Sequence, residues 1–170
     1  MNLEETKIQY PLLLDVTLAL FVQGQKLLLA RKLKKIGAVL WNGPGGKIEV
    51  GETPELAMIR ESREELRVTP TDYRSIGEIT FYFPSTPEWN MRCYLYLVSS
   101  WEGTAQASEE MADPTWFSQT ELPWNEMWQD DKIWLPCVLR GETVRASFLL
   151  NEHNLIKEYE LHGISTTNLV

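Results

Sequence analysis

The chain has 170 residues, of which 44% are hydrophobic and 24% are charged, and this composition predicts one globular domain rather than a disordered chain. Its formal net charge of −8 disfavours a broad contact with nucleic acid, because such a contact needs a basic face. We therefore expect no nucleic-acid partner.

The first apolar run, residues 11–22, is broken by Asp15 and Thr17 and is too short to span a bilayer. We expect no membrane partner. Cys93 and Cys137 have no metal-like spacing and are expected to be reduced and buried. The expected location is the cytoplasm, and a monomer is the expected state.

The first predicted elements are a β-hairpin and a helix. Apolar runs at 12–22 and 26–31 are separated by the sequence QGQ, which predicts two strands joined by a tight turn. The glycine-rich residues 32–47 predict a long loop. A helix is then expected from Pro54 to about Leu66, with Thr53 as its N-cap.

The rest of the chain predicts more strands and one more helix. Strands are expected at 75–83, 92–100, 114–118, 144–151 and 156–161, and a helix within 130–141. Strands with two helices among them predict a mixed α/β layered domain. We expect an N-terminal extension at 1–10, the folded domain at 11–162 and a tail at 163–170.

Three glutamates gather on one side of the helix expected at 54–66. Glu61, Glu64 and Glu65 are spaced i, i+3 and i+4, within about 100° of arc. We expect this carboxylate side to be exposed and the opposite side to be buried. The opposite side carries Leu56, Ile59 and Leu66.

Two interpretations of this acidic side are open. One is a solvated surface with salt bridges to Arg60, Arg63 and Arg67. The other is a site for Mg²⁺ or Mn²⁺, because clustered hard oxygen ligands suit these ions, and such ions bridge carboxylates to phosphate. The preceding glycine-rich loop, whose carbonyls can approach a bound ion, favours the metal site.

The spacing of Gly46, Glu52 and the sequence RESREEL at 60–66 resembles the Nudix box of the Nudix hydrolases. The resemblance implies an α/β/α sandwich with a mixed central sheet and a loop–helix–loop motif. It also implies an enzyme that cleaves a nucleoside diphosphate linked to a further group. Arg67 replaces the usual glycine, so we expect the helix to end differently, and Ser62 replaces an apolar residue at the edge of the buried side.

The resemblance also implies roles for residues in and near the box. Glu61, Glu64 and Glu65 are expected to be metal ligands or the base that activates water, and Arg60 to brace the loop by pairing with Glu52. The further metal ligands implied are the Gly45 carbonyl and Glu110. Mg²⁺ is the expected cofactor, with Mn²⁺ as an alternative, and Lys47 or Lys32 is expected to hold phosphates.

Beyond the box, residues from about 17 to 161 resemble the animal-type MutT homologues, the oxidised purine nucleoside triphosphatases of this family. The sequence MWQDDKIWLP at 127–136 is the most discriminating segment. The resemblance implies that the base pocket is lined by Thr17, Lys32, Asn42, Phe81, Trp128, Asp130 and Asp131.

The chemistry of these side chains is compatible with a purine pocket. Trp128 and Phe81 can stack on a base, and Asn42 can donate and accept along a base edge. Adjacent aspartates in a semi-buried site repel, so that one keeps its proton and donates while the other accepts. Each residue also has an ordinary alternative: Asp130 and Asp131 as helix caps, Trp128 and Phe81 in the core, Lys32 as a solvated cation and Asn42 in a turn.

The expected function is metal-dependent hydrolysis of oxidised purine nucleoside triphosphates, such as 8-oxo-dGTP and 2-hydroxy-dATP. The products would be a nucleoside monophosphate and pyrophosphate, and the nucleotide pool would be sanitised. A Nudix hydrolase of another substrate is one alternative: an alkylated purine triphosphate, a dinucleoside polyphosphate or ADP-ribose. A non-hydrolytic nucleotide-binding module is the other.

Overall fold

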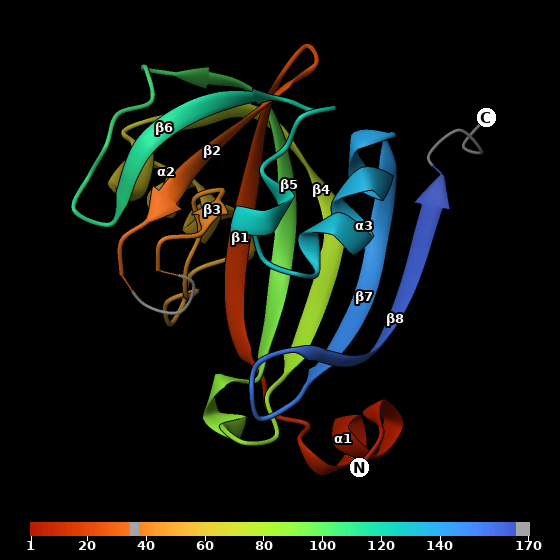
Figure 1. The fold of residues 1–170 in the computed structure, drawn as a ribbon. Coiled ribbons are helices and arrows are strands. Elements are labelled where there is room, and N and C mark those ends of the chain that lie inside the picture. The colour runs from red at the N-terminus through yellow and green to blue at the C-terminus, as the bar shows by residue number, and fades with distance from the viewer. Residues whose placement is uncertain (35–37, 166–170) are drawn as a thin grey trace.

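The computed structural model describes residues 1–34 and 38–165, which contain three α-helices, two short 3-10 helices and a mixed sheet (Figure 1). In chain order the elements are α1 (Leu3–Gln9), β1 (Leu14–Gln23), β2 (Lys26–Lys32), β3 (Trp41–Asn42), α2 (Pro54–Leu66), β4 (Thr69–Tyr82), η1 (Pro87–Trp89), β5 (Met91–Glu102), β6 (Met111–Ser118), η2 (Trp124–Glu126), α3 (Asp131–Leu139), β7 (Glu142–Leu150) and β8 (Ile156–Ser165).

The eight-stranded sheet has the order β3-β2-β1-β5-β4-β7-β8, with β6 also paired to β2. The β1–β5 and β4–β7 pairs are parallel, and the other pairs are antiparallel. The predicted hairpin is confirmed as β1 and β2, and the later predicted strands are all present, several of them longer than expected. The predicted mixed sheet is therefore confirmed.

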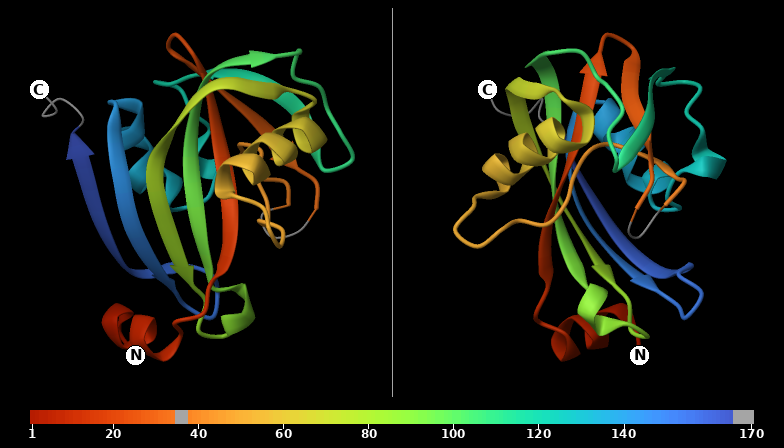
Figure 2. Two further views of the ribbon diagram at one scale, coloured as in Figure 1. Left: turned by 180° about the vertical axis from the view of Figure 1, so that it is seen from behind. Right: turned by 90° about the vertical axis from the view of Figure 1, so that its left-hand side faces the viewer.

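Helices α2 and α3 lie on opposite faces of the sheet, as the two views in Figure 2 show. On β1, Ala19 and Phe21 join the apolar cluster on the α2 side, whereas Leu18 and Leu20 join the cluster on the α3 side. This alternation is what a strand buried on both faces requires. The expected α/β/α layering is confirmed.

Both cysteines are free and buried, as expected. In residues 1–34 and 38–165, no helix has the length and apolar character needed to cross a membrane.

Both ends of the chain contain structure that we did not predict. Helix α1 forms within the expected extension, where Leu3 is fully buried in a cluster with Tyr82 and Leu149. At the other end β8 continues to Ser165, so residues 163–165 of the expected tail belong to a strand. Residues 166–170 lie outside the described range, and the domain boundaries stay a prediction.

The two departures from the Nudix box behave differently from our expectation. Helix α2 does end at Leu66, but Arg67 adopts the left-handed conformation, with φ 61°. The expectation of a different ending was wrong, because the Arg67 N–H donates to the Arg63 carbonyl and closes the helix in the way glycine usually does. Ser62 is fully buried rather than at an edge, and its Oγ donates to the Met58 carbonyl at 2.8 Å.

Replacing Arg67 by glycine is expected to stabilise the protein by about 1 kcal/mol, since glycine adopts positive φ without a Cβ clash. Chemical denaturation measures the change. Arg67→Ala is the matched control, because it removes the same charge but keeps the strain; equal effects of the two variants would contradict the explanation.

Candidate active site

The carboxylate side of α2 is mostly buried. Glu61 is 6% exposed and Glu65 is 0% exposed, whereas Leu56 is 55% exposed, so our expectation was wrong for these three residues. Leu66 is buried, as expected. Only Glu64 of the three glutamates is well exposed. A buried carboxylate requires polar partners, and these come from Arg60 and from the loop before the helix.

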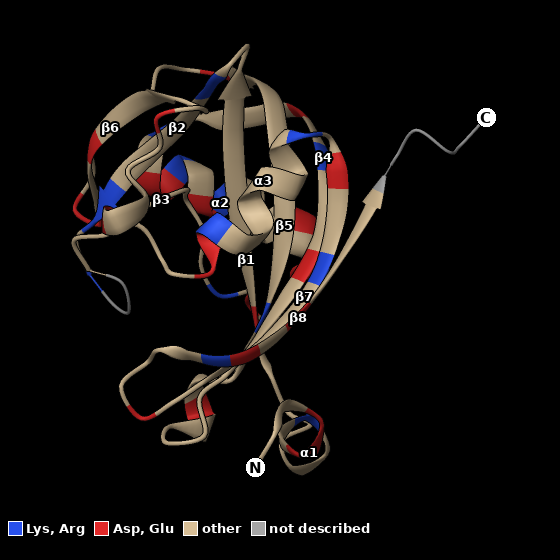
Figure 3. Ribbon diagram, turned by 45° about the vertical axis from the view of Figure 1, so that its right-hand side comes forward, with Lys and Arg blue, Asp and Glu red and all other residues tan. Residues whose placement is uncertain are grey.

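Arg60 connects the carboxylates to that loop. Its guanidinium donates to both carboxylate oxygens of Glu52, at 2.9 and 3.0 Å, and to the Lys47 carbonyl at 2.9 Å. It also donates to Glu61 at 2.9 Å and to Glu64 at 3.3 Å. The hydrogen bond to Glu52 is the main cause that raises the pKa of Arg60. The predicted brace is confirmed, and Figure 3 shows how acidic and basic residues interleave on α2.

Residues 43–46 bring backbone directly against the carboxylates. The loop runs beside β1, where the Thr17 N–H donates to the Gly46 carbonyl at 2.8 Å. The Gly45 N–H donates to Glu65 Oε2 at 2.9 Å. A Cβ on Gly45 would lie 2.0 Å from the Thr17 carbonyl oxygen, and one on Gly46 would lie 2.4 Å from Glu61 Oε1. A side chain at Gly45 would collide with backbone, and one at Gly46 would displace the Glu61 carboxylate.

The charge around Glu65 comes from several elements. Burial raises the pKa of Glu65 to about 7; Lys32 opposes this shift, and the negative charges of Glu61 and Glu110 add to it. The structure therefore brings Lys32 of β2 and Glu110 of the loop before β6 close to the helix carboxylates. Glu65 Oε1 is buried and has no hydrogen-bond partner in the described part of the chain.

A second cluster lies at the start of α3. Asp130 is 7% exposed and Asp131 is 4% exposed. Asp130 occupies the N-cap position but makes no side-chain cap hydrogen bond; its Oδ2 instead accepts from Trp134 Nε1 at 2.9 Å. Asp131 Oδ2 is buried and lacks a partner among the described residues. The simple helix-cap interpretation of Asp130 is therefore not supported.

Both aspartates are pushed towards the neutral form. Burial raises the pKa of Asp130 to about 6, and burial together with the charge of Asp130 raises the pKa of Asp131 well above its ordinary value. Burial also raises the pKa of the Cys93 thiol to about 12; Asp130 adds to this shift and Lys32 opposes it. The charge of Lys32 therefore acts on both Glu65 and Cys93.

The structure does not bring Thr17 to the aspartates. Thr17 lies two residues before Ala19 on β1, so its side chain points to the α2 side of the sheet, whereas Asp130 starts the helix on the other side. Its Oγ1 is buried and without a partner in the described chain. Thr17 therefore groups with Glu65 rather than with Asp130.

The remaining predicted residues keep part of their ordinary roles. Phe81 is half-buried and stacks on Phe148, with ring centroids 5.6 Å apart. Asn42 Oδ1 accepts from the Gly43 N–H at 2.9 Å, which is a turn contact. Trp128 is half-buried next to the aspartates, and Lys47 is exposed beside the loop.

Residues 12–136 match the NUDIX domain. The chain belongs to the Nudix family. It is 37% identical over 149 residues to the oxidized purine nucleoside triphosphate hydrolase of Danio rerio, which covers 88% of this chain and 94% of that protein. It is 34% identical over 150 residues to the protein of the same name from Mus musculus, covering 88% and 95% of the two chains. The predicted family is confirmed.

Solved structures agree with the Nudix fold. The crystal structure of a MutT protein from Bacillus halodurans superposes with a TM-score of 0.74 at 23% identity, covering 88% of this chain and 97% of that one. At this level of identity the likeness concerns the fold alone.

Nudix hydrolases generally need a divalent metal, and the donors around α2 fit one. In the conformation described, no group of three or more His, Cys, Asp or Glu side chains within residues 1–34 and 38–165 is arranged around a metal position. Glu61 and Glu64 are turned towards Arg60 instead. The buried, unpartnered Glu65 Oε1 and the all-oxygen donor set nevertheless suit a hard cation.

Arg31, which no sequence pattern singled out, supports the loop before the Nudix helix. Its guanidinium lies 4.4 Å from the Trp41 ring centroid and donates to the Val39 carbonyl at 3.1 Å. It also pairs with Glu126 of η2 at 2.9 Å. Glu126 is 95 residues from Arg31 in the sequence, and no local sequence pattern predicts a contact over this separation.

Stability without metal is expected to depend on pH through Asp130. The folded-state pKa of Asp130, about 6, lies above the ordinary 3.8, so the folded state binds its proton more tightly. The contribution of this proton to the free energy of unfolding is complete below about pH 4 and is lost as pH rises through about 6. Asp130→Asn should remove this contribution. The free energy of unfolding of the variant minus that of wild type should therefore be roughly 1 to 3 kcal/mol larger at pH 8 than at pH 4.

Urea denaturation at the two pH values measures this effect. Asp72→Asn is the control, because it removes the same charge from an exposed position. A pH slope that is the same in wild type and in the Asp130 variant would contradict the prediction.

Proposed function

We propose that this Nudix protein hydrolyses oxidised purine nucleoside triphosphates, with 8-oxo-dGTP and 2-hydroxy-dATP as substrates, to a nucleoside monophosphate and pyrophosphate. The observation that carries this proposal is the similarity to two oxidized purine nucleoside triphosphate hydrolases, at 37% and 34% identity, over 88% of this chain. Because the similarity extends over nearly the whole of both relatives, it includes the α3 side of the sheet as well as the Nudix helix.

The carboxylate cluster would serve the triphosphate. We assign Glu61, Glu64, Glu65, Glu110 and the Gly45 carbonyl to holding the metal, with Mg²⁺ as the proposed ion and Mn²⁺ as the alternative. When bound, such an ion screens phosphate charge and acidifies water. One of the glutamates takes the proton of the attacking water. Arg60 keeps these carboxylates and the glycine loop in register, and Lys32 and Lys47 add positive charge for the phosphates.

The aspartate cluster would serve the base. Trp128 and Phe81 offer aromatic surface for stacking, and Asn42 offers an amide for a base edge. A raised pKa at both Asp130 and Asp131 favours one shared proton. A carboxyl that donates beside a carboxylate that accepts can match an oxidised purine edge in more than one tautomer. A normal purine would leave a buried polar atom unpaired, which disfavours its binding.

Pyrophosphate release across normal and modified nucleotides, each with and without Mg²⁺, tests the proposal. The expected result is metal-dependent turnover with a higher kcat/KM for 8-oxo-dGTP than for dGTP. Equal values for these two substrates would overturn the substrate assignment. Faster turnover of ADP-ribose, a dinucleoside polyphosphate or an alkylated purine triphosphate would assign another Nudix substrate. Nucleotide binding without hydrolysis would assign a binding module.

A monomeric state and a cytoplasmic location remain part of the proposal. Sedimentation velocity with and without nucleotide measures the first, and fractionation of the source cells measures the second.

A further inference from the structure

One side chain ties the segment before α3 to a distant turn of the sheet. Gln129 lies between Trp128 and Asp130, and its amide makes two hydrogen bonds to the β7–β8 turn. Gln129 Nε2 donates to the Asn154 carbonyl, and Gln129 Oε1 accepts from the Ile156 N–H, both at 3.3 Å. The amide N–H and the amide oxygen of Gln129 thus both form hydrogen bonds, to backbone atoms that are 25 and 27 residues away in the sequence.

The turn that receives Gln129 is well ordered by its own contacts. Asn151 Oδ1 accepts from the backbone N–H groups of His153 and Leu155, at 2.9 and 3.0 Å. The backbone of Asn151 also pairs with Leu155, at 2.9 Å, and accepts from the Asn154 N–H at 3.0 Å. These hydrogen bonds stabilise the turn, so it can hold the Gln129 side chain in a defined position.

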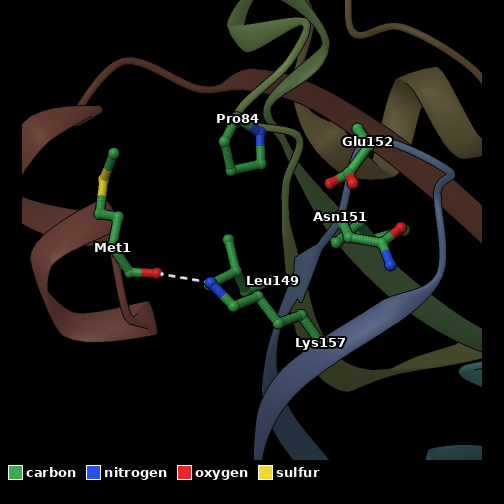
Figure 4. A pocket seen from close by; sticks show the side chains of 7 residues that line it. Met1, Pro84, Leu149, Asn151, Glu152 and Lys157 are labelled. Carbon is green, nitrogen blue, oxygen red and sulfur yellow. Dashed lines mark hydrogen bonds between the residues drawn. The ribbon is translucent and has the colours of Figure 1, made fainter.

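Helix α1 holds the strand that follows the turn. Lys157 Nζ donates to the carbonyl of Met1, just before α1, at 2.9 Å, and both residues line a cavity of about 420 Å³ together with Asn151 and Glu152 of the turn (Figure 4). Further along β8, Glu158 accepts from the Leu3 N–H at 3.0 Å. The anchor of Gln129 is therefore fixed to the body of the sheet and to α1.

The two neighbours of Gln129 differ in how they are held. Asp130 is fixed from the α3 side, because its Oδ2 accepts from Trp134 and its carbonyl accepts from the Ile133 N–H at 2.8 Å. Trp128 precedes the helix, and its carbonyl accepts from the Asp131 N–H at 3.2 Å. The Gln129 bonds lie between these neighbours and fix the backbone from which both side chains project.

We infer that Gln129 is a positioning residue for base discrimination: it anchors the Trp128–Asp131 segment to the β7–β8 turn, and so sets where the stacking ring and the aspartate pair stand relative to the purine. This inference rests on the function proposed above. Gln129 acts through its neighbours and needs no contact with the substrate. Gln129 is not part of the proposed metal cluster. Loss of its two hydrogen bonds should therefore change binding of the base more than the chemical step.

The test compares wild type with Gln129→Met, which keeps the length of the side chain and removes both hydrogen bonds. Gln119→Met is the matched control, because Gln119 Nε2 likewise donates to a turn carbonyl, that of Gly24, at 3.4 Å, but at the β1–β2 hairpin. Steady-state kinetics with 8-oxo-dGTP and dGTP, and calorimetric binding of 8-oxo-dGMP without metal, are measured for each protein.

In Gln129→Met we expect the KM for 8-oxo-dGTP and the Kd for 8-oxo-dGMP to rise about 5-fold or more, with kcat within about twofold of wild type. The ratio of kcat/KM for 8-oxo-dGTP over dGTP should fall, and Gln119→Met should match wild type. An unchanged ratio and Kd in a folded Gln129→Met would overturn the inference while leaving the function intact. If wild type itself does not prefer 8-oxo-dGTP, the proposed function fails first.

If Gln129→Met proves unstable, Gln129→Glu is used to test the inference instead. A glutamate keeps the acceptor for Ile156 but places negative charge against the Asn154 carbonyl. It should shift KM and Kd in the same direction as methionine, and wild-type values for it would also overturn the inference.

Discussion

Glu65→Gln is expected to lower metal-dependent turnover by about 100-fold or more, because it removes a carboxylate charge from the proposed metal cluster. The fold should survive, since the glutamine Oε1 can still accept from the Gly45 N–H that now bonds Glu65 at 2.9 Å. Pyrophosphate release from 8-oxo-dGTP over a range of Mg²⁺ concentrations measures the loss.

A stability measurement shows whether the loss of turnover in Glu65→Gln is caused by unfolding. Burial raises the folded-state pKa of Glu65 to about 7, above its ordinary 4.5, so the metal-free wild type loses stability as pH rises between these values. At pH 8 the metal-free Glu65→Gln protein should be more stable than wild type by about 1 to 3 kcal/mol. Glu55→Gln, on the exposed first turn of the same helix, is the control. Normal turnover in Glu65→Gln would remove the role given to the buried carboxylates.

Gly45→Ala is expected to damage both stability and activity. Its Cβ would lie 2.0 Å from the Thr17 carbonyl oxygen, and backbone cannot rotate away as a side chain can. The loop must therefore shift away from β1, which we expect to cost about 2 to 4 kcal/mol of stability. A shift of about 1 Å in the groups beside Glu65 should lower kcat/KM by about 100-fold. Thermal unfolding and steady-state kinetics measure the two effects.

Gly51→Ala separates steric fit from backbone strain in the same loop. Gly51 has φ +81°, but no atom lies within 4 Å of its Cβ position. The variant should lose about 1 kcal/mol of stability from the left-handed conformation and keep wild-type turnover. If Gly45→Ala also kept wild-type turnover and lost only about 1 kcal/mol of stability, the close approach of the loop to β1 would not be needed for activity.

Much of the fold was predictable because its signals are local. The apolar runs around QGQ define the β1–β2 hairpin, and Thr53 with Pro54 defines where α2 begins. The Nudix box is also local, since all its residues lie between Gly46 and Arg67. The pairing of Arg60 with Glu52 followed from that motif and is found at 2.9 Å.

Other features depend on contacts between distant parts of the chain. A helix as short as α1 is not stable alone, and it exists here because Leu3 is buried against Tyr82 and Leu149. The Gln129 contact with the β7–β8 turn likewise joins residues that no local pattern connects.

The family, the β1–β2 hairpin, helix α2 and the later strands could be predicted from the sequence, because spacing and turn chemistry are properties of neighbouring residues. The burial pattern of α2 depended on contacts with distant residues: Leu66 is buried as predicted, but Glu61 and Glu65 are buried as well. Apolarity favoured covering Leu56, yet Glu65 is covered instead, because the glycine loop beside β1 and the guanidinium of Arg60 supply the polar partners of this carboxylate side. Burial, in turn, shifts the pKa values of Glu65 and Asp130, which no spacing rule contains.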